Sequence, residues 1–264
     1  MRIGFIGLGN MARAMIEGML SKGIASKEDI MGSAKTEATL ASIKEKYGIE
    51  TTLDNGLLAE NSDILILAIK PQFFGDVLPK IREKVKEDTL IISIAAGKTI
   101  ADIEDLFGRK LKLVRCMPNT PALIGEGCSG VCRNSKVSDL EMAKCMELIE
   151  SFGFAQEVPE HLIDAVSGVS GCSPAYVFMF LEALADGAVE AGMPRKQAYV
   201  FAARAVMGSA KLLLETGLHP GELKDMVTSP AGTTIEGVRT LEERGFRGAV
   251  IDAVKASIEK SKNM

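Results

Sequence analysis

The sequence predicts an α/β fold with a doubly wound, mostly parallel sheet, followed by an all-helical region. Three observations support this prediction. Strand-like apolar runs alternate with helical patterns up to about residue 158, as crossover-connected parallel strands require. One run, ILILAI at 64–69, is apolar throughout, which is typical of a central strand covered on both faces. From residue 161 to 264 the strand patterns stop, and helical patterns are separated by glycine and proline.

The predicted elements follow the chain in a regular order. Helical patterns at 36–47 and 74–86 separate some of the strands. The predicted strands are RIGFIG, DIMGS, DILILAIK, TLIISIAAG and KLVRCM. We therefore predict one domain over 1–158 and a second, helical domain over 159–264 in a chain whose 47% hydrophobic content suffices for two cores.

One predicted helix, PAYVFMFLEALADGAVEA at 174–191, is apolar around most of its circumference. Such a helix is suited to the interior of a bundle or to a subunit interface. We therefore expect a homodimer built through these helices.

Charge and composition exclude several classes of partner. The net charge of -4 offers no electrostatic surface for nucleic acid or an anionic membrane, so an anionic ligand must be bound by a local site. The N-terminus lacks a signal-peptide pattern, and the longest apolar run is too short to span a bilayer, so we expect a cytoplasmic protein. Five cysteines and two histidines are too scattered for a metal site, and we expect none.

The N-terminal stretch IGFIGLGNMARAM places Gly7, Gly9 and Ala12 as G-x-G-x-x-A between an apolar strand and an amphipathic helix. The glycines permit a tight turn and close approach of a pyrophosphate, whose charge meets free N–H groups at the helix start. In this strand-turn-helix context the motif predicts a Rossmann domain that binds a dinucleotide.

The end of the second predicted strand points to the type of dinucleotide. NAD-preferring domains carry an acidic residue there, whereas this chain offers Ser33 and Lys35. A hydroxyl and an ammonium group suit a 2′-phosphate, so we expect NADP(H) to be preferred and leave NAD(H) open. An alternative for this stretch is a solvated helix start capped by Thr36.

Two further segments end strands at the edge where open α/β sheets bind ligands, AIKP at 68–71 and SIAAG at 93–97. Small residues such as Ala95 and Ala96 leave room for a ring to lie against the backbone, although ordinary strand-to-helix turns would look similar. The proline-rich loop at 117–127 either lines the nicotinamide side or only connects to the strand CSGVC.

The late segment VTSPAGTTIEG, residues 227–237, is a candidate anion receptor. Pro230 stops a preceding helix, Gly232 allows unusual dihedral angles, and a new helix begins at Thr233 and Thr234 with unpaired amides. Such amides hold a small anion, and the Thr234 hydroxyl is placed to bond a neighbouring ligand atom. A tight interhelical turn with a threonine cap is the alternative.

Together, GFIGLGNMA, AIKP, SIAAG, RCMPNTPALIGEG, SGCSPAYVF and TSPAGTTIEGVRTLE resemble the pyrroline-5-carboxylate reductases, in this order along nearly the whole chain. The resemblance implies a Rossmann domain, a helical dimerisation domain and NADPH-dependent reduction of 1-pyrroline-5-carboxylate, a small-molecule substrate, to proline. It also implies sites shared between two subunits. Family members often form rings of dimers, which leaves a larger ring open here.

The resemblance also assigns residues. It implies that Thr234 is the catalytic residue, bonding the ring nitrogen, and that Ser229, Gly232, Thr233 and Thr234 bind substrate, with the carboxylate on backbone amides. The implied cofactor residues, with Lys35 added from its charge, are Gly7, Leu8, Gly9, Asn10, Met11, Ala12, Ser33, Lys35, Asn55, Ala68, Ile69, Lys70, Pro71, Ala95 and Ala96.

The sequence leaves two other functions open. A 3-hydroxyacid dehydrogenase shares the domain plan, and Gly168 and Gly171 imitate its glycine-rich turn, but Val177 stands where its lysine would be. A protein that binds NADPH without turnover would keep most of the same pattern. The intact SPAGTT segment argues against it, because such a protein needs no second anion site.

Overall fold

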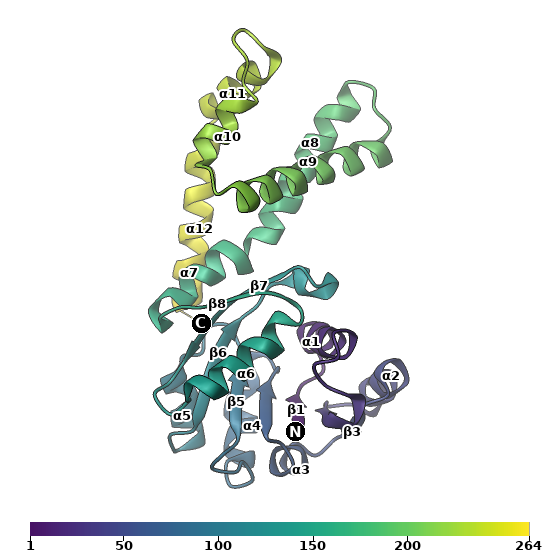
Figure 1. The fold of residues 1–264 in the computed structure, drawn as a ribbon, viewed down its shortest axis with the longest axis vertical. Coiled ribbons are helices and arrows are strands. Elements are labelled where there is room, and N and C mark those ends of the chain that lie inside the picture. The colour runs from purple at the N-terminus through teal and green to yellow at the C-terminus, as the bar shows by residue number, and fades with distance from the viewer. Residues whose placement is uncertain (264) are drawn as a thin grey trace. The chain divides into compact units, whose positions relative to one another are not determined.

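The computed structural model describes residues 1–263, and the chain forms two compact units (Figure 1). The first unit consists of Met1–Cys172 together with the described residues from Ser257 onward, and the second is Ser173–Ala256. Residues 159–172, which the sequence assigns to the helical domain, lie in the first unit.

The first unit is built on one eight-stranded sheet with the strand order β3-β2-β1-β4-β5-β6-β7-β8. All neighbouring strands are parallel except β6 and β7, which confirms the doubly wound, mostly parallel sheet. The strands are β1 (Ile3–Ile6), β2 (Ile30–Ser33), β3 (Glu50–Thr52), β4 (Ile64–Leu67), β5 (Leu90–Ser93), β6 (Lys112–Met117), β7 (Gly127–Arg133) and β8 (Gly153–Glu157).

Helices cover both faces of this sheet because the apolar side chains of the central strands alternate between two cores. On β4, Ile64 and Ile66 belong to a core with α1, α2 and α6, whereas Leu65 and Leu67 belong to a core with α3, α4 and α5. These helices are α1 (Asn10–Ser21), α2 (Glu37–Tyr47), α3 (Asn55–Glu60), α4 (Phe74–Ile81), α5 (Ile100–Phe107) and α6 (Asp139–Glu150).

Shorter helices complete the first unit. They are the 3₁₀ turns η1 (Lys27–Asp29), η2 (Pro71–Phe73), η3 (Thr120–Ile124) and η4 (Glu160–Leu162), the helix α7 (Ile163–Val166) and the π turn η5 (Ser167–Gly171). Only η3 lies between β6 and β7, and this connection is too short for a parallel crossover, so β7 returns antiparallel. Asn119 fixes the connection, since its side chain accepts from the Cys128 amide at 2.8 Å and donates to the Ser170 carbonyl at 3.0 Å.

The second unit is built from helices, and two of them, α8 and α9, pack side by side (Figure 1). Its elements are α8 (Ser173–Glu190), α9 (Arg195–Thr216), α10 (Pro220–Met226), α11 (Thr233–Glu243) and most of α12 (Phe246–Lys262). Few apolar side chains of α8 and α9 are buried within a single chain. Large exposed ones include Phe178, Met179, Val200 and Phe201, each more than 60% accessible.

The helical stretch Glu160–Glu190 is long and apolar enough, by length and composition alone, to cross a membrane. The same properties suit a helix that is covered by another protein surface.

Candidate functional site

The turn after β1 is held in the form that the glycine motif predicts. The Gly7 amide donates to the Ser33 carbonyl at 2.9 Å, which joins the turn to the end of β2. Gly7 has a φ of 96°, and a Cβ there would lie 2.7 Å from the Ala68 carbonyl oxygen at the end of β4. A side chain at position 7 is therefore excluded both by backbone conformation and by space.

Gly9, unlike Gly7, has an ordinary backbone conformation and open space around it. Its φ of -73° and ψ of -174° suit any residue, and a Cβ built there meets nothing within 4 Å. The open space lies in front of α1, where no described residue accepts a hydrogen bond from the amides of Asn10, Met11 or Ala12. A glycine with open space beside free helix amides fits the close approach of a pyrophosphate.

A cavity of about 800 Å³ opens beside this turn. It lies at the carboxyl ends of β1, β2 and β4, where the strand order reverses and doubly wound sheets bind their ligands. Its lining is Ile6, Gly7, Leu8, Gly9, Arg13, Ser33, Ala34, Lys35, Thr39, Leu53, Asn55, Ala68, Ile69, Lys70, Phe73, Asp76 and Val77.

Most of the residues expected to contact the cofactor converge on this cavity. Those in its lining are Gly7, Leu8, Gly9, Ser33, Lys35, Asn55, Ala68, Ile69 and Lys70. The others, which lie outside the lining, are Asn10, Met11, Ala12, Pro71, Ala95 and Ala96. Asn10, Met11 and Ala12 form the first turn of α1 and Pro71 begins η2, while Ala95 and Ala96 follow β5.

Ser33 and Asn55 form one wall of the cavity as a bonded pair. Ser33 is fully buried, and its hydroxyl donates to the Asn55 side-chain oxygen at 2.6 Å. Asn55 begins α3, whose first turn is fixed because Asp54 accepts hydrogen bonds from the amides of Gly56 and Leu57. The Ser33 hydroxyl therefore holds the Asn55 side chain in place at the cavity wall.

The start of α2 carries the helix cap expected at Thr36 and places Lys35 in the cavity lining. Thr36 is the N-cap and its hydroxyl accepts a 3.4 Å hydrogen bond from the Thr39 amide, while Lys35 and Thr39 line the cavity. Lys35 remains exposed, with no ion pair among the described residues. A helix cap and a cationic cavity wall therefore occupy neighbouring positions.

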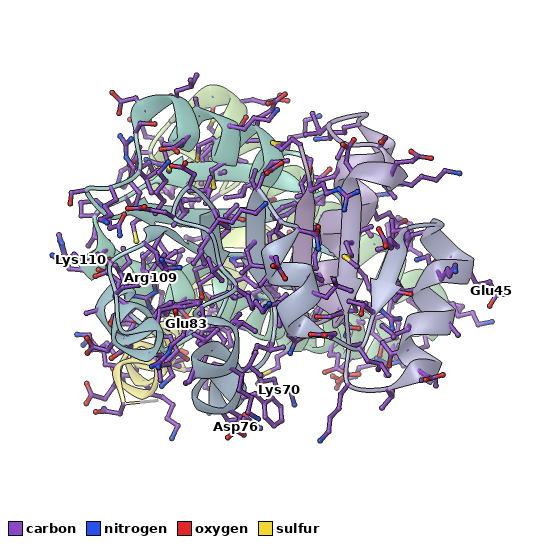
Figure 2. The ribbon with its side chains drawn as sticks, turned by 90° about the horizontal axis from the view of Figure 1, so that it is seen from below. Glu45, Lys70, Asp76, Glu83, Arg109 and Lys110 are labelled. Carbon is purple, nitrogen blue, oxygen red and sulfur yellow. The ribbon has the colours of Figure 1, made fainter. Side chains whose placement is uncertain are left out.

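Eight further cavity residues were not anticipated from the sequence: Ile6, Arg13, Ala34, Thr39, Leu53, Phe73, Asp76 and Val77. Several of them stand next to recognised motifs: Arg13 follows G-x-G-x-x-A directly, and Phe73 follows AIKP after one intervening residue. Lys70 and Asp76, which Figure 2 labels, add one charge of each sign to the rim.

In the segment between α10 and α11, the residue with an unusual backbone conformation is not the one that the sequence predicts. Gly232 has an ordinary extended conformation, with φ -82° and ψ 171°, so the expectation that it supplies unusual dihedral angles is wrong. The left-handed residue is Ala231, with a φ of 57°. A Cβ at Gly232 would meet the hydroxyl oxygen of Ser229 and lie 3.1 Å from the Ser229 carbonyl oxygen, so the Ser229 side chain would have to move to accommodate it.

The helix α11 begins at Thr233, as the sequence predicts, and its first amides are free. Gly232 is its N-cap without a side-chain hydrogen bond, and the Gly232 amide donates to the Ser229 carbonyl at 3.0 Å. Within the described chain, no acceptor is bonded to the Thr233 or Thr234 amides. Both threonines are exposed, so these N–H groups are accessible to a small anion.

Three of the five cysteines, Cys116, Cys132 and Cys145, are buried and unsuited to act as nucleophiles. Burial raises the pKa of Cys116 and of Cys132 to about 12, and it also raises the pKa of Cys145, so these three thiols stay protonated. The described residues contain no group of three or more His, Cys, Asp or Glu side chains that could hold a metal ion.

Comparison with known proteins places this geometry in a family. The family model described as pyrroline-5-carboxylate reductase dimerisation matches residues 160–264, and the model described as NADP oxidoreductase coenzyme F420-dependent matches 2–97. A pyrroline-5-carboxylate reductase of Methanosarcina acetivorans is 45% identical, with 100% of this chain and 97% of that protein aligned. The chain belongs to the pyrroline-5-carboxylate reductase family.

Other members of the family agree over the same length. The Escherichia coli K12 pyrroline-5-carboxylate reductase is 46% identical, with 100% of this chain and 98% of that protein covered. A crystal structure of Plasmodium falciparum pyrroline carboxylate reductase with NADP bound has a TM-score of 0.91 at 32% identity, covering 99% of this chain and 97% of that one. As in the family, the chain is an oxidoreductase with a dinucleotide-binding fold.

Proposed function

We propose that this protein reduces 1-pyrroline-5-carboxylate to L-proline, the last step of proline biosynthesis, with NADPH as the preferred hydride donor and NADH as a possible second one. The observation that carries the proposal is the combination of the open Gly9 turn with the free amides of Thr233 and Thr234, in a chain that aligns over 97% of a pyrroline-5-carboxylate reductase. The Gly9 turn suits a dinucleotide pyrophosphate, and the amides of Thr233 and Thr234 suit the carboxylate of a small substrate.

The cofactor site in this proposal is the cavity at the ends of β1, β2 and β4. The amides at the start of α1 bind the pyrophosphate, and Asn55, held by Ser33, faces the adenosine side. Ala95 and Ala96 with residues 68–71 lie along the path towards the nicotinamide. When bound, NADPH supplies a hydride.

The substrate site consists of Ser229, Gly232, Thr233 and Thr234. The amides at the start of α11 bind the substrate carboxylate, and this anchor orients the imine carbon. The Thr234 hydroxyl bonds the ring nitrogen and holds it as the C=N bond is reduced. A protonated cyclic imine is already electrophilic, so the protein needs to orient it and exclude water rather than provide a nucleophile.

The domain assignment follows from these roles. We propose that residues 1–158 are the NADP-binding domain and that residues 159–264 are the dimerisation and substrate-binding domain. The family match over 160–264 supports this division. The exposed apolar side chains of α8 and α9 support a homodimer. That each complete site takes residues from two subunits is part of the proposal and follows from the family resemblance.

A second subunit, rather than lipid, is the proposed cover of the apolar stretch Glu160–Glu190, because the dimerisation match includes all of it. Light scattering of the purified protein distinguishes a dimer from a larger ring of dimers. The free state of all five cysteines supports a reducing, cytoplasmic location.

The direct test is an assay of the purified full-length protein. On adding 1-pyrroline-5-carboxylate we expect NADPH absorbance to fall and proline to appear in equal amount. A control with 3-hydroxyacids and NADP tests the alternative oxidoreductase chemistry. Turnover of the hydroxyacids, or NADPH binding without any reduction of the imine, would contradict the proposal.

A further inference from the structure

Arg13 occupies an unusual position beside the glycine turn. It lies in the first part of α1, is half-buried and lines the cavity. Its Nε donates to the Leu8 carbonyl at 3.1 Å, which folds the side chain back over the turn. Within the described residues this is the only hydrogen bond of the guanidinium, and no carboxylate pairs with it. Its two terminal nitrogens therefore remain free to bind a ligand.

The cavity is locally basic although the chain as a whole is acidic. Its lining holds Arg13, Lys35 and Lys70 against one carboxylate, Asp76, whereas the net charge of the chain is -4. None of these four side chains forms an ion pair with another described residue. Unpaired cations concentrated in one cavity of an acidic protein are suited to an anion carrying more than one charge.

Arg13 is connected to β2 through the glycine turn. The hydrogen bond to Leu8 places the guanidinium beside a residue whose side chain packs against Gly32, in β2. The neighbouring Gly7 is bonded to Ser33 at the end of that strand. The end of the second strand is where doubly wound domains meet the adenosine ribose, and Arg13 and Lys35 both line the cavity beside this strand end.

We infer that Arg13 and Lys35 together bind the 2′-phosphate of NADPH, and that Arg13 is a residue that determines the preference for NADPH over NADH. This inference rests on the proposed use of NADPH. A guanidinium presents two parallel N–H groups to a phosphate, and its Nε remains available for Leu8 while the terminal nitrogens bind the ligand. Thr39 is a further hydroxyl on the same wall.

The test compares the binding of NADPH and NADH to the full-length protein by isothermal titration calorimetry, without substrate. Replacing Arg13 by Gln keeps a donor for the Leu8 carbonyl but removes the charge. Loss of one charge-assisted contact should raise the Kd for NADPH about 10- to 100-fold and leave the Kd for NADH within about twofold. Arg82→Gln, the same exchange at an exposed position outside the cavity lining, should change neither Kd.

Other outcomes would overturn the inference. Equal weakening of NADPH and NADH would mean that Arg13 binds the pyrophosphate, which both share. Unchanged binding of both would mean that it does not contact the cofactor. If the wild-type protein binds neither nucleotide, the proposed function itself fails, whereas wild-type binding with an unaffected Arg13→Gln variant contradicts the inference alone.

A double-mutant cycle tests whether the two cations act on one phosphate. If Arg13 and Lys35 contact the same group, the Kd for NADPH in the double variant Arg13→Gln/Lys35→Gln should differ from the product of the two single effects by about threefold or more. Adenosine 2′,5′-bisphosphate, which has no nicotinamide, should show the same pattern. Independent effects would mean that the cations bind different groups and would contradict a shared site.

Discussion

The two glycines of the first turn allow a matched pair of substitutions that separates folding from cofactor binding. At Gly9 an alanine finds ordinary dihedral angles and open space, so Gly9→Ala should fold normally. At Gly7 an alanine faces a φ of 96° and a 2.7 Å approach to the Ala68 oxygen, so Gly7→Ala should be destabilised. The same added methyl group thus has opposite consequences two residues apart.

The magnitudes follow from these surroundings. Left-handed strain of about 1–2 kcal/mol and crowding of about 1–3 kcal/mol should destabilise Gly7→Ala by about 2–5 kcal/mol in total. For a chain of this size that corresponds to a fall of about 5–15 °C in Tm. In Gly9→Ala the Tm should stay within about 2 °C, but the methyl group enters the space proposed for the pyrophosphate. Loss of one charge-assisted hydrogen bond there raises the Kd for NADPH about 10- to 100-fold.

The assay combines differential scanning fluorimetry with calorimetric titration of NADPH. Because NADH carries the same pyrophosphate, its affinity should fall in Gly9→Ala as much as that of NADPH, unlike the selective effect expected for Arg13→Gln. Wild-type NADPH affinity in a stable Gly9→Ala variant would refute the assignment of this turn as the pyrophosphate site.

Three further predictions concern other elements. Thr234 is exposed, so Thr234→Ala should leave Tm unchanged but lower kcat/KM for the imine by about one to two orders of magnitude, through one lost hydrogen bond; unchanged kinetics would remove its role. Ala231, with its φ of 57°, should be relieved of strain in Ala231→Gly, which raises the free energy of unfolding by about 0.5–1 kcal/mol in urea titrations. Hydrogen bonds, of which that from Lys112 has the largest effect, lower the pKa of Glu141 from its ordinary 4.5 to about 2. The ionised carboxylate therefore stabilises the fold fully above pH 4.5, and this contribution is lost as the pH falls through 2. Glu141→Gln should therefore lower the free energy of unfolding by about 1–2 kcal/mol at pH 7 and by little at pH 2; an equal loss at both would contradict this.

The glycine turn and the central strands could be predicted because local spacing and apolar runs determine them. The strands β3 and β8 could not be identified in this way, since Glu50–Thr52 has no buried side chain and Gly153–Glu157 has one, Ala155. Edge strands of this kind are recognised only through their hydrogen-bonded neighbours.

The residues that line the cavity could likewise be predicted only in part from the sequence. Its motif residues were found from spacing, but Arg13 and Asp76 approach it from different helices, and only the folded sheet brings them together. Proline and small residues predicted the helix start at Thr233, but the left-handed conformation fell on Ala231 instead of the adjacent glycine. Composition indicates that a turn is present but does not determine which of its residues adopts the left-handed conformation.

The central claim is that free amides at the start of α11 bind a carboxylate and thereby orient an imine for reduction. The most direct measurement is the ratio of kcat/KM for 1-pyrroline-5-carboxylate to that for 1-pyrroline, the same ring without the acid group. Loss of two charge-assisted hydrogen bonds predicts a ratio on the order of 100 or more. Equal values for the two imines would contradict the account.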